Sequence, residues 1–290
     1  MQPSQPAETG GHTRTRLAVW ALMFGNIATG LCILAPAAML AELAAGLDVT
    51  IRDAGLLMTY GSALACIGSP VMAWVTSRID RRILLVVTLA IVAGGQAASA
   101  FAPDYATLLA VRLLMLVAVV IYTPQAASTT AMIVAEKDRA SAVSFVFVGW
   151  TLAIAGGMPV ATSLAAHLGW REAYLALSAA TALICILLMI GLPSRLQGIA
   201  ISFRSWINIG HNPQILLLLL STILVATGSF VITTYLGPLI SRLADGGPTE
   251  IAFFFAIFGI MNLVGNVAVT RIVMGLGASL TSLVSIVLIG

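Results

Sequence analysis

Apolar residues fill eight long stretches of this chain, and short charged turns separate each stretch from the next. Each stretch meets or exceeds the ~20 residues that a helix needs to cross a ~30 Å hydrocarbon core. Lipid cannot satisfy open backbone groups, and the stretches lack the two-residue alternation of barrel strands, so we expect helices. The pattern predicts an all-α, polytopic membrane helical bundle, with spans at residues 17–41, 54–77, 83–103, 105–135, 140–170, 173–194, 205–241 and 251–270.

The lengths of the connections divide these spans into two groups. Turns within the first six spans are short, which makes successive helices antiparallel neighbours, and the one longer connection follows the sixth span. A ninth stretch from Ala278 to Gly290 would reach only ~20 Å at ~1.5 Å per residue, too short to cross. We expect a polar N-terminal tail, a six-helix bundle, a linker and a partial second bundle with two full helices and a fragment, at residues 1–16, 17–194, 195–213 and 214–290.

Composition and charge agree with a membrane protein and orient it. Charged residues are 9% of the chain, against about 25% in a soluble domain. With the N-terminus on the cytoplasmic side, ten basic residues fall inside and three outside, which is the asymmetry that the positive-inside rule describes. We therefore expect a multi-pass inner-membrane protein with a cytoplasmic N-terminus. The net charge of +3 is explained by this distribution, so the lipid bilayer and not nucleic acid is the expected partner.

Arg112 is the single formal charge well inside a predicted span. A charge at mid-membrane costs at least ~2.5–3.5 kcal/mol, so Arg112 should face protein or water and mark a pathway. The alternative is that it extends to the outer interface, since Asp104 is close in sequence. No Asp, Glu or Lys lies deep in any span, which argues against an intramembrane enzyme. The three cysteines show no metal-ligand spacing, so we expect no metal and no cofactor.

The segment from Gly68 to Arg82, GSPVMAWVTSRIDRR, lies between the second and third spans. It resembles the signature loop of the major facilitator superfamily, most closely that of the drug and metabolite:proton antiporter branch, with the pattern G-x-L-A-D-R-x-G-R-R. Ala73, Ser77 and Asp80 depart from the first glycine, the aspartate and the second glycine. The resemblance implies a cytoplasmic gating loop, although basic residues at a helix end also obey the positive-inside rule. Its candidate residues are Ser77, Arg78, Asp80, Arg81 and Arg82.

Two further features extend the resemblance, one residue in the fourth span and a short run in the fifth. Arg112 falls where the family keeps a basic residue in its fourth helix, which implies a part in proton coupling. The fifth span carries Gly156, Gly157 and Pro159, and this run resembles the antiporter motif of helix 5. Glycine and proline permit close helix approach and a bend, so the run is a candidate hinge, with plain helix packing as the alternative.

Uncharged polar and aromatic residues near mid-depth are candidates to line a cavity. Taken singly, each is more often a hydrogen-bonded packing residue than a substrate ligand. Together they predict a mostly apolar cavity, which suits lipophilic or amphipathic cargo. The candidates are Asn26, Tyr60, Tyr122, Gln125, Trp150, Thr151, Tyr235 and Asn262.

The resemblance implies a secondary transporter that exports a drug-like compound or small metabolite by proton antiport through alternating access. Its partners would be a small-molecule substrate and protons, and its oligomeric state is open. A uniporter or symporter is an alternative, because the first span has no acid where many proton-driven relatives carry one. A third possibility is a C-terminally truncated piece of a roughly twelve-helix protein, inactive alone because its second bundle is incomplete.

Overall fold

The computed structural model describes residues 8–194, 196, 211–244 and 246–276, with side chains described from residue 14 to residue 265 within those ranges. Every long regular element in these ranges is helical, which confirms the predicted all-α bundle. Eight helices in the described part are long and apolar enough to cross a membrane, as the sequence predicts. The ninth stretch and most of the predicted linker lie outside the described residues.

The first three spans follow the prediction closely. They are α1 (Glu8–Ala38), α3 (Ile51–Val75) and α4 (Arg81–Ala100), and a short helix, α2 (Leu40–Gly46), continues from the end of α1. The helix of α1 begins inside the predicted polar tail, because no proline interrupts the chain between Pro6 and Pro36.

The next two spans are interrupted helices. The fourth comprises α5 (Tyr105–Val119) and α6 (Tyr122–Ile133). The fifth follows a short 3₁₀ turn, η1 (Glu136–Asp138), and combines three segments in sequence. These are α7 (Arg139–Leu152), the π-helix η2 (Ala153–Gly157) and α8 (Met158–Leu168). The remaining described spans are α9 (Trp170–Gly191), α11 (Pro213–Leu243) and α12 (Pro248–Leu276).

Polar side chains at the turns explain where several helices begin. Asp80 accepts hydrogen bonds from the backbone N–H groups of Arg82 and Ile83, and so caps α4. Asp104 caps α5 in the same way, because its carboxylate accepts a hydrogen bond from the backbone N–H of Thr107. This hydrogen bond lowers the pKa of the Asp104 carboxyl below its usual value. Gly169 lies at the turn between α8 and α9 and has a φ of 109°. Residues that carry a side chain rarely adopt this backbone conformation, so glycine suits the position.

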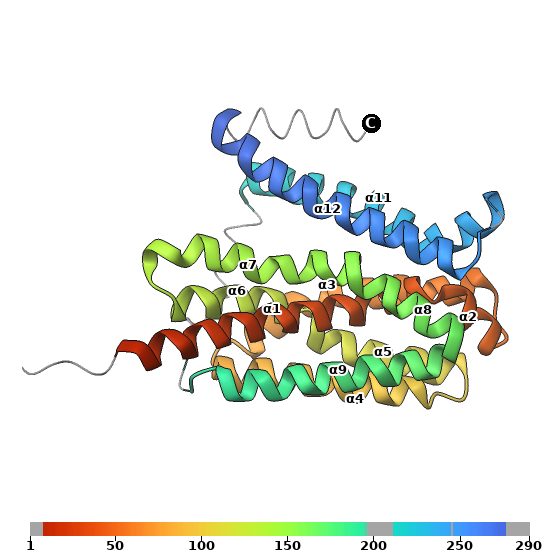
Figure 1. Ribbon diagram of the computed structural model, residues 1–290, viewed down its shortest axis with the longest axis horizontal. Helices are drawn as coiled ribbons and strands as arrows, with labels where there is room; N and C mark the ends of the chain where they lie inside the picture. Colours follow the sequence, from red (N-terminus) through yellow and green to blue (C-terminus); the bar gives the residue numbers. More distant parts are fainter. Residues whose placement is uncertain (1–7, 195, 197–210, 245, 277–290) are drawn as a thin grey trace, which may run out of the picture.

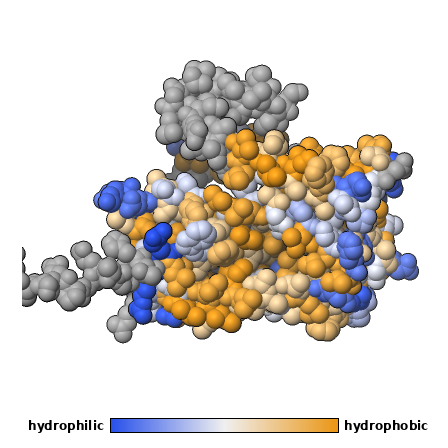
Figure 2. All heavy atoms as spheres, viewed as in Figure 1, coloured by the Kyte–Doolittle hydropathy of each residue, from blue (hydrophilic) through white to orange (hydrophobic). Residues whose placement is uncertain are grey.

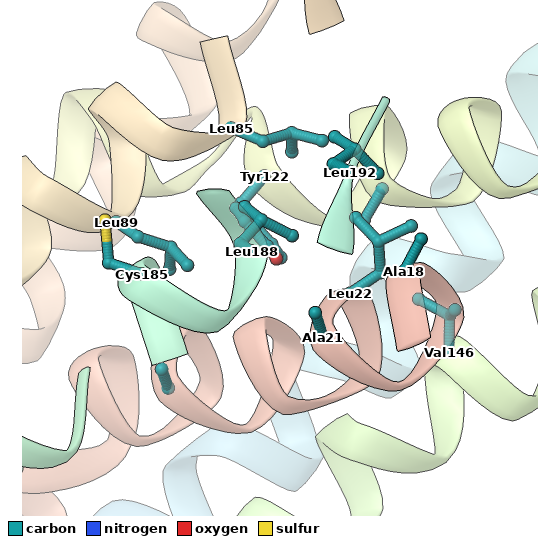
Figure 3. Packing of buried hydrophobic residues seen from close by; sticks show 12 residues of the cluster. Ala18, Ala21, Leu22, Leu85, Leu89, Tyr122, Val146, Cys185, Leu188 and Leu192 are labelled. Carbon is teal, nitrogen blue, oxygen red and sulfur yellow. The ribbon is translucent and has the colours of Figure 1, made fainter. Parts of the chain in front are cut away.

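The first six spans pack as one half of the molecule, and α11 with α12 lies along one side of it (Figure 1). Within the first half, α4 packs on α9, and α1 packs on both α7 and α9. Figure 3 shows part of the core, where Leu22, Tyr122 and Leu188 lie together. In Figure 1, α4 and α9 lie on the side of the bundle away from α11 and α12.

The surface has the character expected of a protein in a bilayer. Figure 2 shows apolar side chains across the middle of this face and hydrophilic ones gathered toward its two ends. Many large apolar side chains are exposed, among them Ile67, Leu114 and Ile190. Because lipid is as apolar as these side chains, their exposure carries no penalty there.

Candidate functional site

Arg112 lies beside a carbonyl of α1 that lacks its helical hydrogen bond. Pro36 has no N–H, so it cannot make the helical hydrogen bond to the carbonyl of Cys32, four residues earlier. Arg112 reaches this carbonyl from α5: its Nη1 and Nη2 atoms both lie 3.4 Å from the Cys32 oxygen. Nη2 also lies 3.4 Å from the oxygen of Ile33. These bonds are long, but they place the guanidinium over the carbonyl that the proline leaves without a helical partner.

The environment of Arg112 is fully protein-lined. Its side chain is 1% exposed, and Nη1 also donates to the hydroxyl of Tyr174 on α9 at 3.3 Å. Its Nε has no hydrogen-bond partner among the described residues. The partners recorded for Arg112 in that part of the chain are neutral oxygens. The guanidinium therefore points into the bundle, toward α1 and α9, and does not extend to the outer interface.

A second polar contact fastens α1 to its neighbours. The side-chain Nδ2 of Asn26 donates to the carbonyl of Val146 on α7 at 2.9 Å. Its Oδ1 accepts from the hydroxyl of Thr123 on α6 at 2.9 Å. Both polar atoms of Asn26 are thereby used in joining three helices. Tyr122 is fully buried nearby and packs on Gly25, with no partner for its hydroxyl among the described residues.

The structure does not gather the eight candidate cavity residues at one place. Gln125 and Thr151 are buried within the first half, like Asn26 and Tyr122, and half-buried Trp150 packs on Gly30. Three candidates are exposed, namely Tyr60, Tyr235 and Asn262. Of the eight, Tyr235 makes a close approach between the halves, because its hydroxyl lies against Gly55 of α3.

The candidate hinge in the fifth span is an irregular helix. Residues 153–157 form a π-helix immediately before Pro159. Gly157 packs on Leu31 of α1, whereas a side chain at Gly156 would meet open space. Gly259 of α12 lies so close to Ala155 that a Cβ atom there would overlap the Ala155 backbone. The π-helix is thus a place where α12 packs tightly on the first half.

The described contacts between the halves extend from the middle of the spans toward one end of the molecule. Phe255 of α12 is fully buried in a cluster with Leu34, Met58 and Met158 of the first half. The buried residues of α11 fall between Thr233 and Ile240, in its second half. Toward the other end, where the 77–82 turn lies, α3 has no buried residue after Gly61, and the first half of α11 exposes most of its side chains. Figure 1 shows α11 and α12 inclined to α7, so that the space between the halves widens toward that end.

Comparison with known proteins identifies the family of this chain. The family model of the Major Facilitator Superfamily matches residues 21–290. This chain belongs to the Major Facilitator Superfamily. It is 31% identical over 246 residues to the inner membrane transport protein YdhP of Escherichia coli, an alignment that covers 85% of this chain and 63% of that protein. The chain therefore spans less than two thirds of the length of this relative.

The chain is also similar to a named efflux pump and to a solved transporter structure. It is 26% identical over 243 residues to a chloramphenicol efflux pump of Mycobacterium tuberculosis, which covers 81% of this chain and 58% of the pump. Its fold matches a bacterial homologue of the human lysosomal transporter Spinster, solved in an inward-facing and unoccupied conformation, with a TM-score of 0.74 and 15% identity. That match covers 93% of this chain and 64% of the other, and it shows the fold alone.

The turn that resembles the superfamily's signature loop is fastened to the first half. Buried Ser77 donates to the carbonyl of Trp74, and Arg82 donates through Nη2 to the carbonyl of Met189 on α9. The backbone N–H of Arg81 donates to the carbonyl of Leu196 at 2.9 Å. Arg78 is exposed, and Asp80 caps α4. Within the described residues, the recorded long-range bonds of this turn go to the end of α9 and the residues after it.

The sequence alone did not identify three residues that take part in the contacts of Arg112 and of the end of α1. Pro36 provides the unpaired carbonyl beside Arg112, and Tyr174 supplies the neighbouring hydroxyl. Thr162 of α8 donates to the carbonyl of Ala38, at the end of α1, at 2.7 Å. A proline within a span always leaves a carbonyl without its helical partner, so Pro36 was detectable from sequence. The identity of the residue that reaches the carbonyl depends on packing, which no local pattern shows.

Proposed function

We propose that a carrier built on this chain exports a drug-like compound or small metabolite by proton antiport, through alternating access. The observation that carries this proposal is the uneven contact between the halves along their length. The contact is dense around Gly259 and the π-helix and is open toward the 77–82 turn. A carrier needs such a geometry, because a central site must open to one side of the membrane at a time.

The proposed pivot is the crossing of α12 over the π-helix. Gly259 has no side chain, so α12 can rock against Ala155 without moving a rotamer, and Gly156 leaves open space next to it. An irregular turn that already lacks the regular hydrogen-bond pattern costs less to deform than a continuous α-helix. Gly156, Gly157 and Pro159 are the hinge residues in this proposal, and the 77–82 turn is the gate at the open end.

Arg112 is the proposed link to proton movement. A guanidinium does not release its proton in proteins, so Arg112 would act by its charge on a titrating group and would not itself carry the proton. Its recorded partners are neutral oxygens, which leaves its charge available to such a group. The same observation favours the second candidate function, a uniporter or symporter, because no carboxylate is recorded as bonded to Arg112 in the described part of the chain.

Transport of a fluorescent dye distinguishes these functions. Everted membrane vesicles from cells that express the protein from its gene would be mixed with the dye and energised with a respiratory substrate. Antiport predicts dye accumulation that an uncoupler abolishes, whereas uniport predicts flux that the uncoupler leaves unchanged. Equal dye movement in vesicles from cells without the gene would contradict both functions.

Orientation in the membrane is a separate part of the proposal. The charge asymmetry places the N-terminus and the 77–82 turn in the cytoplasm. In a chain whose exposed Cys66 is replaced by serine, a cysteine at exposed Asp104 should react with an impermeant thiol reagent in intact cells. A cysteine at exposed Arg78 should react only after the cells are opened. The reverse pattern would invert the topology.

A further inference from the structure

A groove runs along the bundle surface where the start of α4 meets the end of α9, close to the 77–82 turn. It consists of two adjoining hollows of about 510 and 720 Å³, and both are lined by Arg82 and Ser194. We call it the α4–α9 groove. Because α4 and α9 lie on the side away from α11 and α12 in Figure 1, the groove does not belong to the space between the halves.

The first hollow of the groove is polar and positively charged. Arg14 of α1 and Arg82 of α4 line it, together with Thr15 and the backbone that follows α9. Arg82 donates through one nitrogen to the carbonyl of Met189, which holds its side chain over the groove. Two arginines from different helices thus converge on one hollow, a suitable arrangement for binding a phosphate group.

The second hollow of the groove is mostly apolar. Ile83, Val86 and Val87 of α4 line one side and Met189 of α9 lines the other. Asp80 also lines this hollow, but its carboxylate caps α4 by accepting from the N–H groups of Arg82 and Ile83. Ile83 and Val87 are 58% and 48% exposed on α4, a helix long and apolar enough to cross the bilayer. An apolar channel therefore continues from the charged hollow toward the membrane interior.

We propose that the α4–α9 groove binds an anionic phospholipid. The phosphate lies between Arg14 and Arg82, and one acyl chain follows the wall formed by Ile83, Val86 and Val87. The commitment to a lipid rests on the adjacency of the two hollows, because a free anion would use only the charged one. Basic pockets between transmembrane helices on the cytoplasmic side are suited to such head groups.

Lipid titration of the purified protein tests this site. Native mass spectrometry would measure binding of phosphatidylglycerol and phosphatidylcholine with the same acyl chains to the detergent-solubilised chain. We expect phosphatidylglycerol to bind more tightly, and Arg14→Gln and Arg82→Gln each to weaken it about fivefold. Arg139→Gln is the matched control, because Arg139 is exposed at the same end and does not line the groove.

Two more measurements separate a lipid from a free anion. Val87→Trp, which fills the apolar hollow at an exposed position, should weaken both lipids, and inorganic phosphate should not displace phosphatidylglycerol. Displacement by phosphate, with no effect of Val87→Trp, would show an anion site and overturn the proposal. Unchanged phosphatidylglycerol binding in Arg14→Gln would also overturn it. Among the described residues that variant removes no recorded hydrogen bond, so we expect its fold to be intact.

Discussion

Two spans of the first half have a disturbed hydrogen-bond pattern at or just before a proline, and we call each of these places a break. The two breaks are contacted by residues from different parts of the molecule. In α1 the carbonyl left by Pro36 is reached by Arg112, a side chain of the same half. In the fifth span the π-helix before Pro159 is met by Gly259, a residue of the other half. One irregularity is therefore closed within a half, and the other forms the contact between the halves.

The difference indicates what each break does. A buried side chain with several hydrogen bonds fixes its helix, so the contact of Arg112 makes α1 part of a rigid unit with α5 and α9. The contact of Gly259 with the backbone of Ala155 provides close packing but no side-chain hydrogen bond, so the halves can move at this contact. The comparison thus predicts that the Pro36 break governs stability of the half and the Pro159 break governs movement between halves.

The largest effect should come from enlarging Gly259. In Gly259→Leu the side chain would overlap the backbone of Ala155, which must move α12 away from the π-helix. We expect dye transport to fall to the level of cells without the gene, and the overpacking to destabilise the contact by about 1–3 kcal/mol. Gly265→Leu is the control on the same helix, because nothing lies within 4 Å of that position. Equal transport in both variants would remove the proposed pivot.

Arg112→Ala should have the next largest effect. It leaves the Cys32 carbonyl buried without a partner, at a cost of about 1–3 kcal/mol in the free energy of unfolding, and removes the charge proposed to act in coupling. Thermal unfolding in detergent and dye efflux would measure the two losses, and Arg112→Lys should keep part of each. Arg171→Ala is the comparison, since Arg171 also donates to a carbonyl, that of Ala102, but is half-buried. A normal Arg112→Ala protein would contradict both roles.

A smaller effect should appear as coupling between Pro36 and Arg112. Pro36→Ala restores the N–H that the Cys32 carbonyl lacks, so Arg112→Ala should cost about 1 kcal/mol less in that background. The melting temperatures of the wild type, both single variants and the double variant would give the coupling energy. Strictly additive effects would show that the arginine is held by something other than the break.

The smallest effect should come from the second fastening of α1. Thr123→Val removes one hydrogen bond to Asn26 while keeping the shape of the side chain, so we expect a loss of about 1 kcal/mol in stability. Ser128→Ala, at an exposed position of the same helix, should change little. A loss in Thr123→Val as large as that in Arg112→Ala would show that polar ties in general, and not the proline break, make the half rigid.

The spans were predictable because the bilayer leaves few options. A long apolar stretch must be helical in lipid, so the existence and order of the eight helices followed from sequence. The depth of Arg112 was also predictable, since it is the single charge within a span. Hydropathy did not locate the interruptions at residues 120–121 and 153–157. The apolar character of a stretch is the same whether its turns are α-helical or π-helical.

The candidate site was harder to predict because it depends on which helices pack together. Asn26 and Tyr122 looked like cavity residues, since a polar atom in a span can face either water or another helix. The structure uses both polar atoms of Asn26 between helices and buries Tyr122 in the core. The partners of the 77–82 turn depend on the end of α9, more than a hundred residues later in the chain.

The π-helix has a consequence for how this span tolerates changes in length. A π-helix accommodates one more residue in its turn than an α-helix does, so the faces of α7 and α8 keep their alignment around an inserted residue. Deleting Gly156, whose position opens on empty space, would convert the turn to regular helix without rotating either flank. The fifth span could thus have two lengths in related proteins while presenting the same surface to α1 and to α12.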